Sequence, residues 1–400
     1  MKGEKPVKIP ADAAFLLEKL NQKGHEAYVV GGCVRDALLG RTPQDWDLCT
    51  SALPKETAAT FSDHKLVLDG LVHGTVGVVR NGVLYEITTF RTESGYADAR
   101  HPDEVRFVRR IEEDLARRDF TVNAMAYHPE RGLVDCFGGK NDLQKGILRC
   151  VGDPDTRFHE DALRILRAIR FAAVYGLSVE EETARAALRL CPQLSRISAE
   201  RIGAKLTRFL CGANAPRMIT DFWPILSVIL PEIGEENWNA VSERMKATEP
   251  RLILRLAVLL YPAKEDAQRL LWRLRVAKNT AQQVLSLLQR QDPALPEKAA
   301  LRLILGQLGE DLTRLRLQLD KALTGDETSF LRQTELLDEI LRNGDCCSLS
   351  QLAVSGRDLQ KSGFRGPQIG QVLQTLLLAV VREEAKNEKT VLLSLAERER

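Results

Sequence analysis

The sequence predicts an α+β N-terminal head followed by an all-α remainder. Strand signals are concentrated in the first 140 residues. The clearest is a hairpin, in which Thr75–Arg80 and Val83–Phe90 are joined by Asn81-Gly82, the dipeptide that a two-residue type I′ turn prefers. From about residue 157 onward, apolar residues recur at helical spacing and strand signals are almost absent. A chain of 400 residues exceeds one ordinary core, so we expect several packed units.

The elements of the head follow from local pattern. An amphipathic helix is predicted over 11–23, and the strand-like run 27–30 ends at Gly31-Gly32. Pro54 suits the first turn of a later helix, because the missing N–H costs nothing there. Further elements are a helix over 33–39 that stops at Gly40, an extended segment Asp45–Cys49, helices over 159–175, 180–190 and 198–210, and a helical succession from 250 to 342. Breaks are predicted at Asp153-Pro154, Cys211-Gly212-Ala213 and Asn343-Gly344.

The composition limits the classes of protein to which this chain can belong. With 44% hydrophobic and 28% charged residues, the chain has the composition of a soluble globular protein. It contains no apolar run near the roughly 20 residues of a membrane span, and its N-terminus lacks the apolar core of a signal peptide. We therefore expect a cytoplasmic protein with no membrane partner, and the sequence shows no obligatory protein partner. The eight cysteines form no C-x-x-C pair, so they indicate buried thiols and not zinc.

Charge is distributed unevenly, although the net charge is only +2. The segment 164–208 holds nine Lys/Arg against four Glu. A local basic face is typical of a protein that binds a phosphate backbone, and a solvated helix face has a similar composition.

A phosphate-binding turn is predicted where the first strand ends. Gly31 and Gly32 allow close approach of the backbone, the following helix offers free N–H groups, and Arg35 adds a cationic fork. Most Gly-Gly turns are only turns, and no G-x-x-x-x-G-K-[ST] P-loop occurs.

Two carboxylates are predicted to hold a metal ion. On an extended strand Asp45 and Asp47 point to one face, where like charges repel unless a cation such as Mg²⁺, shared with substrate phosphates, neutralises them. A lone D-x-D is usually surface, but its position some ten residues after the Gly-Gly turn makes a metal site more specific. Glu86, within a predicted strand, is either a third ligand or a solvent-facing residue, and the second alternative is slightly favoured.

Charged residues also precede a buried stretch at Arg117-Arg118-Asp119. An arginine anchored there can reach a triphosphate, with Asp119 orienting it. The alternative is a structural ion pair at a helix end.

Base recognition is predicted on the helix that contains Asp161 and Arg164, which are three residues apart and therefore side-chain neighbours. An acceptor beside a donor fork matches the amino group and ring nitrogen that cytosine and adenine both present. Uracil and guanine present a carbonyl and an N–H instead, which leaves buried groups unpaired. Arg167 and Arg170 continue the row. A surface salt-bridge ladder would have the same periodicity.

The ordered set of motifs resembles the tRNA nucleotidyltransferase/poly(A) polymerase family, within the DNA polymerase beta-like superfamily. The resemblance is dense over 27–210, and Leu352–Leu359 with Gly363 and Gly370 looks like the family's C-terminal tail. The matching motifs are Gly31-Gly-x-Val-Arg-Asp36, Asp45-x-Asp47, Arg117-Arg-Asp-Phe-Thr-x-Asn-Ala124 and Glu160-Asp-x-x-Arg164.

This resemblance implies a nucleotidyltransferase head (1–140), a base-recognising neck (141–210), a helical body (211–343) and a tRNA-binding tail (344–400). It implies Mg²⁺ on the catalytic residues Asp45 and Asp47, and in-line attack of a tRNA 3′-hydroxyl on the α-phosphate of CTP or ATP. The implied nucleotide-binding positions are Gly32, Arg35, Arg118, Asp161, Arg164, Arg167 and Arg170.

Within the family, the sequence is similar to the branch that adds C, C and A in turn. Residues 91–105 resemble the flexible loop with which such enzymes switch from C to A. Glu160-Asp161-Ala162 replaces the Asp-Pro usual in bacterial poly(A) polymerases, and the last 20 residues carry equal numbers of basic and acidic residues. No His-Asp dipeptide occurs, so an HD-type phosphohydrolase domain is not expected. One departure is Lys205, where the family often carries an acidic residue.

Two alternatives to CCA addition fit the same motifs. The first is A-only addition or polyadenylation by the same chemistry. The second is an RNA-binding protein with an inactive head, against which the intact Asp45, Asp47 and Arg118 argue.

Overall fold

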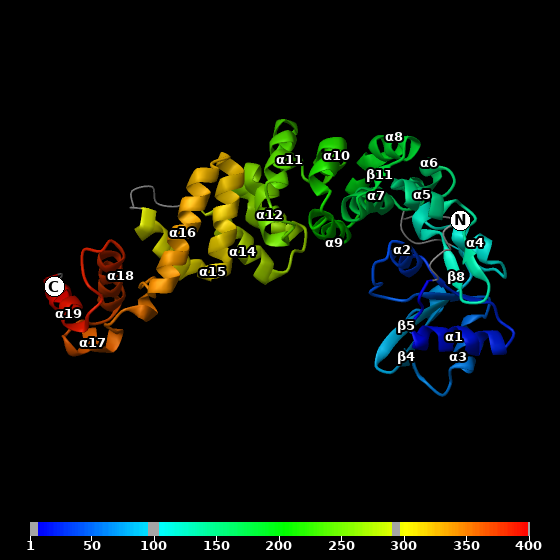
Figure 1. Cartoon of the computed structure of the whole chain (residues 1–400), viewed down its shortest axis with the longest axis horizontal. Coiled ribbons are helices and arrows are strands. Elements are labelled where there is room, and N and C mark those ends of the chain that lie inside the picture. Colours follow the sequence, from blue (N-terminus) through cyan, green and yellow to red (C-terminus); the bar gives the residue numbers. More distant parts are fainter. Residues whose placement is uncertain (1–6, 95–103, 290–296, 399–400) are drawn as a thin grey trace. The chain divides into compact units, whose positions relative to one another are not determined.

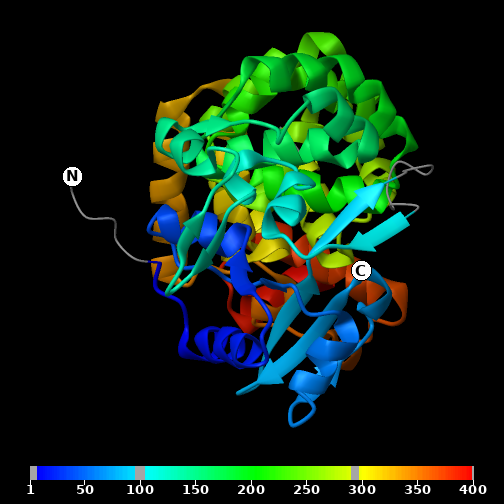
Figure 2. The same ribbon diagram turned by 90° about the vertical axis from the view of Figure 1, so that its right-hand side faces the viewer.

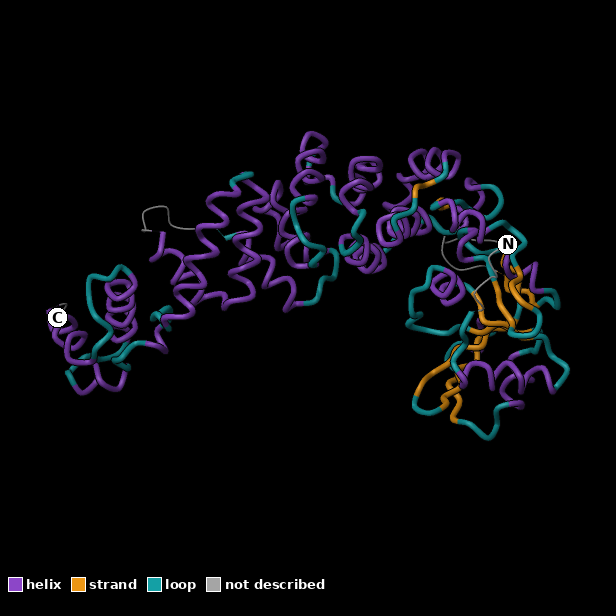
Figure 3. Tube along the Cα trace, in the orientation of Figure 1, coloured by secondary structure: helices purple, strands orange, loops and turns teal. Residues whose placement is uncertain are grey.

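The computed structural model describes residues 7–94, 104–289 and 297–398. Packing divides the chain into two compact units, Met1–Pro231 and Glu232–Arg400. Strands belong to the first unit alone among the described residues, and the second is helical (Figures 1 and 3). This confirms the predicted order of an α+β part followed by an all-α part. The finer division into head, neck, body and tail stays a prediction. Among the helices so described, none is long and apolar enough to cross a membrane.

The centre of the first unit is a seven-stranded mixed sheet in the order β3-β4-β5-β2-β1-β8-β9. Strands β2 and β5 run parallel, and the other neighbours pair antiparallel. The bounds are β1 Ala27–Val30, β2 Leu48–Thr50, β3 Lys65–Val67, β4 Thr75–Arg80, β5 Val83–Thr89, β8 Ala126–His128 and β9 Gly132–Val134. The order places the C-terminal end of β1 beside the start of β2, where Leu48 pairs with Ile87 of β5. These strands bring together residues far apart in sequence.

The hairpin between β4 and β5 has the predicted register, with Arg80 opposite Val83. Asn81 and Gly82 both have positive φ, 49° and 80°, as a type I′ turn requires. A second hairpin, β6 (Arg91–Ser94) with β7 (Glu104–Phe107), stands apart from the large sheet, as the cyan pair in Figure 2 shows. It forms the two ends of the predicted flexible loop, whose residues 95–103 lie outside the described part of the chain.

Helices cover the sheet where apolar periodicity predicted them. Helix α1 (Ala11–Gln22) buries Leu16, Leu17 and Leu20 against β1 and β2, beside α3 (Pro54–Thr60), which begins at the predicted proline. The remaining short helices of this part are α2 Gly32–Leu38, α4 Ile111–Ala116 and α5 Gly139–Lys145.

The last part of the first unit is a helical layer. Asp153 caps α6 by accepting a hydrogen bond from the Thr156 backbone N–H at 3.0 Å, which confirms the predicted break at Asp153-Pro154. The continuous helix predicted over 159–175 is wrong, because Asp161 has extended backbone angles and separates α6 from α7. The bounds are α6 Pro154–Glu160, α7 Leu163–Tyr175, α8 Glu181–Leu190, α9 Ala199–Leu210 and α10 Ala215–Ile229, with the short strands β10 Ile147–Leu148 and β11 Ser178–Val179.

The second unit confirms the succession of helices predicted from 250 to 342. Gly344, in the left-handed region at φ 64°, ends α16 where a break was predicted. The buried Arg302 on α15 donates to the carbonyl oxygens of Val380 and Val381, which lie at the C-terminal end of α18. The bounds are α11 Trp238–Lys246, α12 Leu252–Leu260, α13 Ala267–Arg273, α14 Lys278–Leu288, α15 Glu297–Thr324, α16 Glu327–Asn343, α17 Gly356–Lys361, α18 Pro367–Val381 and α19 Lys389–Arg398.

Candidate active site

The turn between β1 and α2 supports the candidate site. Gly31 has φ 79°, a conformation that favours glycine, and its N–H donates to the Met125 carbonyl at 3.0 Å. The Arg35 backbone N–H donates to the Gly31 carbonyl at 3.1 Å and starts α2. Gly32 is the first residue of that helix. The predicted turn from strand to helix is thus present, and the phosphate contact at Gly32 stays a prediction.

Carboxylates gather beside the C-terminal end of β1, where β2 begins and β5 runs alongside it. The Asp47 carbonyl accepts from the Val30 N–H at 3.0 Å, which holds it beside β1. The strand itself begins only at Leu48, so the extended segment predicted from Asp45 is shorter than expected. Asp47 and Glu86 line one cavity of about 140 Å³, whose other walls are Val30, Leu48, Thr88, Arg91, Arg117 and Arg118.

The carboxylate of Asp47 lies close to other negative charges, and this affects its pKa. Burial of its carboxylate raises the pKa of Asp47, and the charges of Glu86 and Asp45 raise it further, while Arg118 opposes them. Asp47 as a whole residue is nevertheless exposed to solvent, and so is Glu86. Glu86 is therefore a solvent-facing residue of its strand, which was the slightly favoured interpretation of the sequence. It also lines the same cavity as Asp47.

A hard divalent cation fits this donor set. Neighbouring carboxylates repel each other and raise each other's pKa. A bound cation that prefers oxygen ligands removes this repulsion. Within the described ranges, no group of three His, Cys, Asp or Glu side chains is close enough to enclose a metal ion by itself. The remaining ligands would have to come from substrate or water, which is how proteins usually hold Mg²⁺.

A larger cavity of about 490 Å³ adjoins this one and shares Arg117 and Arg118 with it. Its walls come from the segment after α4, from the break between α6 and α7, and from α7 and α9. We call it the arginine pocket, and it is lined by Arg117, Arg118, Asp119, Asp161, Leu163, Arg164, Arg167, Glu200, Arg201, Ala204 and Lys205. Four predicted nucleotide-binding residues meet here: Arg118, Asp161, Arg164 and Arg167.

Within the arginine pocket, Asp161 and Arg164 have separate partners. Asp161 accepts from Arg201 at 3.0 Å, and Arg164 donates to Glu160 at 2.5 Å. The break in the helix at Asp161 explains this, because its other oxygen accepts the Leu163 backbone N–H at 3.0 Å. The expectation that one continuous helix carries both residues is wrong, although both side chains reach the same pocket, and their contact with a base stays a prediction.

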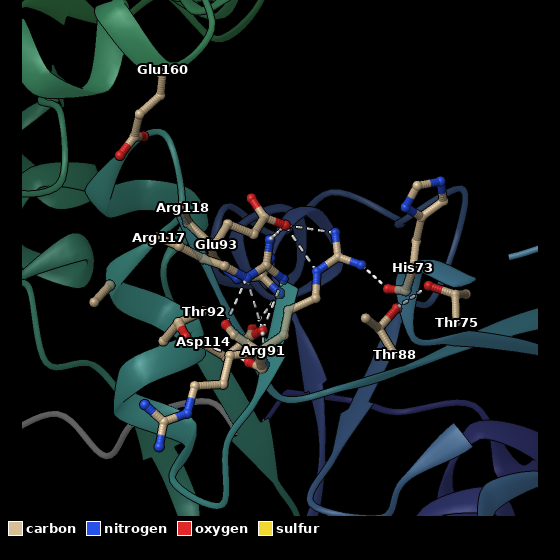
Figure 4. Close-up of polar contacts among 12 residues, drawn as sticks. His73, Thr75, Thr88, Arg91, Thr92, Glu93, Asp114, Arg117, Arg118 and Glu160 are labelled. Atoms are coloured by element: carbon tan, nitrogen blue, oxygen red, sulfur yellow. Dashed lines mark hydrogen bonds and ion pairs between the residues drawn. The ribbon is translucent and has the colours of Figure 1, made fainter. Parts of the chain in front are cut away.

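Asp114 is the carboxylate that orients Arg117 and Arg118. It is 1% exposed and accepts from Arg117 Nη2 at 2.8 Å and from Arg118 Nη2 at 3.2 Å (Figure 4). These two arginines lower the pKa of Asp114 despite its burial. The predicted orienting role of Asp119 is wrong, since Asp119 bonds Arg167 Nε at 2.8 Å instead. Asp114 precedes the arginines by three and four residues, a helical spacing that could have revealed it.

Glu93 connects this arginine pair to the hairpin of β6 and β7. It accepts from Arg117 at 3.0 Å and from Arg91 at 2.7 Å, and Figure 4 shows it between the two guanidinium groups. Arg117 also donates to the Arg91 carbonyl at 3.1 Å. Arg91 and Glu93, at the base of the predicted flexible loop, are therefore hydrogen-bonded to Arg117, which lines both cavities. No local sequence pattern indicated this link.

Arg35 and Arg170 line neither cavity. Arg35 is 5% exposed and donates to Asn123 and Tyr175, which fixes α2 against α7. Arg170 has its guanidinium 4.0 Å from the centre of the Phe171 ring. The predicted nucleotide contacts of these two residues stay predictions.

Proteins of known identity are similar to this chain over nearly its whole length. The chain is 35% identical to a CCA-adding enzyme of Pediococcus pentosaceus over 96% of both chains, and 36% identical to one of Limosilactobacillus reuteri over 96% of this chain and 95% of that protein. The chain belongs to the CCA-adding enzyme family. Three family profiles agree: a Poly A polymerase head domain over 27–149, a probable RNA and SrmB-binding site of polymerase A over 176–235, and a putative tRNA nucleotidyltransferase domain 2 over 246–396.

Solved structures show the same architecture. The Bacillus stearothermophilus CCA-adding enzyme in complex with CTP has a TM-score of 0.78 and 30% identity, with 97% of this chain and 96% of that chain covered. The Thermotoga maritima CCA-adding enzyme in complex with a tRNA has a TM-score of 0.71 at 22% identity, covering 98% and 96%. The head is therefore of the nucleotidyltransferase class that the motifs predicted, and members of this family use divalent metal ions.

Proposed function

We propose that this chain adds C, C and A in turn to the 3′ end of tRNA, using CTP and ATP and releasing pyrophosphate. The observation that carries the proposal is the pair of adjoining cavities that share Arg117 and Arg118, the smaller with Asp47 and Glu86 in its wall and the larger lined mainly by arginines. Relatives that match nearly the full chain are CCA-adding enzymes. We also propose that the protein works in the cytoplasm, where tRNA and both nucleotides are available.

The smaller cavity, which has Asp47 and Glu86 in its wall, has the chemistry for nucleotidyl transfer. We propose that Asp45 and Asp47 hold Mg²⁺, with Glu86 as a candidate third ligand. When bound, this ion neutralises phosphate oxygens and lowers the pKa of the attacking hydroxyl. The chain's own part is to place carboxylates and Arg118 around one phosphoryl group. Arg118, held by Asp114, opposes the negative charge of the leaving pyrophosphate.

The arginine pocket has the groups needed to select the base. Each carboxylate oxygen accepts two hydrogen bonds, so Asp161 keeps capacity for an exocyclic amino group while bonded to Arg201 and Leu163. Arg164, held by Glu160, offers the donor for the ring nitrogen. Cytosine and adenine satisfy both groups. Uracil and guanine leave them unpaired, which costs binding free energy.

One assay tests the proposal. The protein is incubated with Mg²⁺, CTP and ATP and with tRNA transcripts that end before CCA or after CC, and with an unrelated RNA. The expected result is addition of three nucleotides to the first transcript, of A alone to the second, and none to the third. Continued ATP addition to any RNA would show a poly(A) polymerase. A protein that binds RNA but adds nothing would have an inactive head.

A further inference from the structure

One face of strands β3, β4 and β5 continues outward from the candidate active site. Residues directly opposite each other in an antiparallel pair share a face of the sheet, and Gly77 of β4 lies opposite Glu86 of β5. A Cβ atom placed on Gly77 would lie 2.9 Å from Leu84 Cδ1 and 3.0 Å from Val67 Cβ. Leu84, Val67 and Glu86 are therefore on the same face, which we call the outer face.

The two faces of these strands differ in burial. Val78 and Ile87, on the inner face, are 0% and 1% exposed, and α3 packs against β4 and β5. On the outer face Leu84 is 48% exposed, and Glu86 is exposed as well. Because Gly77 has no side chain, Leu84 and Val67 approach each other above it and form a low apolar surface beside Glu86. We call Val67, Gly77 and Leu84 the apolar platform.

A lysine lies at the edge of the platform. Lys65 of β3 is opposite Val79, and Val79 is opposite Leu84, so all three are in one row on the outer face. Lys65 is exposed, and its side chain has no ion pair or hydrogen bond to any residue of 7–94, 104–289 or 297–398. Sheet spacing makes this face about 10 Å wide from β5 to β3 and about 7 Å long from Glu86 to Leu84. An apolar surface with a cation at its edge is complementary to a nucleoside and its phosphate.

The reaction needs a place for the attacking nucleoside beside the smaller cavity. The arginine pocket, which the proposed function assigns to the incoming nucleotide, adjoins this cavity through Arg117 and Arg118. In-line displacement brings the attacking hydroxyl from the side opposite the leaving pyrophosphate, which the proposed function assigns to Arg118. The outer face reaches the same cavity through other residues, Glu86 and Thr88 of β5. A nucleoside on the platform would have its hydroxyl beside the carboxylates without passing the two arginines.

We propose that the apolar platform and Lys65 hold the last nucleoside of the RNA acceptor, whose 3′-hydroxyl attacks the α-phosphate. Leu84 and Val67 contact its base or ribose, and Lys65 binds the phosphate on its 5′ side. The inference rests on the proposed function and deepens it by adding a subsite for the second substrate. Apolar contact tolerates any base, which suits an enzyme whose acceptor gains a new last nucleotide with every addition.

Leu84→Ala tests the platform. The lost apolar contact should lower kcat/KM for tRNA lacking CCA about fivefold, while the KM for CTP stays within about twofold of the original. Val83→Ala is the matched control, because Val83 precedes Leu84 on the same strand, is 51% exposed and points to the other face. It should leave both constants unchanged. Leu84→Phe should retain or raise kcat/KM for tRNA, because an aromatic ring stacks on a base.

Lys65→Gln tests the phosphate contact. The slope of log kcat/KM for tRNA against log salt should become shallower by about 0.7, because one contact to a single-stranded phosphate is lost. Lys65→Arg should keep the original slope. Lys55→Gln is the matched control, since Lys55 is an exposed lysine of α3, away from the outer face. It should also keep the original slope.

Photocrosslinking locates the nucleoside in the unaltered protein. A tRNA lacking CCA carries 4-thiouridine as its last nucleotide, and the complex is formed with Mg²⁺ and a CTP analogue that has a methylene group between its α- and β-phosphates. Irradiation should attach the base to the tryptic peptides 66–80 or 81–91, which contain the platform. Attachment to 164–208 or to 232–400 instead would overturn the proposal.

The kinetic outcomes decide equally. Equal losses in Leu84→Ala and Val83→Ala would overturn the proposal, because the effect would not depend on the face. A raised KM for CTP with unchanged kcat/KM for tRNA would assign the face to the triphosphate and overturn it as well. Should Leu84→Ala lower the Tm, the salt dependence of Lys65→Gln and the crosslink still decide. An unaltered protein that adds no nucleotide would refute the proposed function, while the crosslink would still show whether the RNA end lies on the platform.

Discussion

A Cβ atom placed on Gly31 would lie 2.8 Å from Nη1 of Arg118. The turn after β1 therefore runs directly against the guanidinium that lines both cavities. With φ 79°, Gly31 also occupies a region that side chains rarely adopt. The glycine that the sequence assigned to phosphate approach thus has a second role, which is to leave room for an arginine 87 positions further along the chain.

The first prediction follows from this contact. In Gly31→Ala the methyl group displaces Arg118, so kcat/KM for CTP and ATP should fall at least tenfold, while stability falls by about 1 to 3 kcal/mol from backbone strain. The control is Gly82→Ala, which has similar strain at φ 80° but no atom within 4 Å of the new methyl group. It should lose stability and keep kcat/KM. Equal kinetic losses in both variants would contradict the displacement of Arg118.

The second prediction concerns Asp47. Asp47→Asn should lower kcat for both nucleotides by at least about 10²-fold, because an electrostatic element of the site is lost. The raised pKa of Asp47 means that the folded state binds its proton more tightly than the unfolded state. Its carboxylate therefore destabilises the fold increasingly as pH rises above the ordinary aspartate value of 3.8. Without Mg²⁺ at pH 7, the variant should have a higher Tm than the unaltered protein.

Asp69→Asn is the control for this variant, since Asp69 is exposed and lines neither cavity. It should leave both kcat and Tm unchanged. A lower Tm for Asp47→Asn would mean that the carboxylate stabilises the fold, contrary to the pKa direction. Asp45→Ala should likewise abolish addition of both C and A.

The third prediction concerns Asp114. Asp114→Asn leaves Arg117 and Arg118 without their buried counter-ion, so the free energy of unfolding at pH 7 should fall by about 3 to 5 kcal/mol. Because the pKa of Asp114 is lowered, its stabilisation is present above the unfolded value and is lost as pH falls through the folded one. Chemical denaturation should therefore show a difference between variant and original that shrinks below pH 3.8. A pH-independent difference would indicate lost packing instead.

The fourth prediction concerns base selection by Arg164. Arg164→Ala should reduce discrimination of CTP over UTP by about 10- to 100-fold, since one hydrogen-bonding partner of the base is lost. Arg157→Ala is the matched control. Arg157 also pairs with Glu160, at 2.7 Å, but does not line the arginine pocket. Single-nucleotide incorporation with each triphosphate measures both. Unchanged discrimination in Arg164→Ala would refute its assignment to the base.

The sequence by itself determined the elements whose signals are local. The β4–β5 hairpin was predictable because Asn81 and Gly82 adopt positive φ at little cost. Periodicity likewise predicted α8 and α9 to within a residue or two. Motif order identified the family, and with it the residues Asp47, Arg118, Asp161 and Arg164 that the fold then brought to two adjoining cavities.

Only the tertiary structure decided which charges are partners. Asp161 pairs with Arg201 and not with Arg164, because the helix breaks at Asp161 and α9 approaches it from 40 positions away. Glu93 holds Arg117 across 24 positions. Ionic attraction depends on distance in space, and spacing along the chain predicts that distance only within a regular helix or strand. The sequence therefore named the charged residues of the site, and packing assigned Asp161, Asp119 and Glu93 their partners.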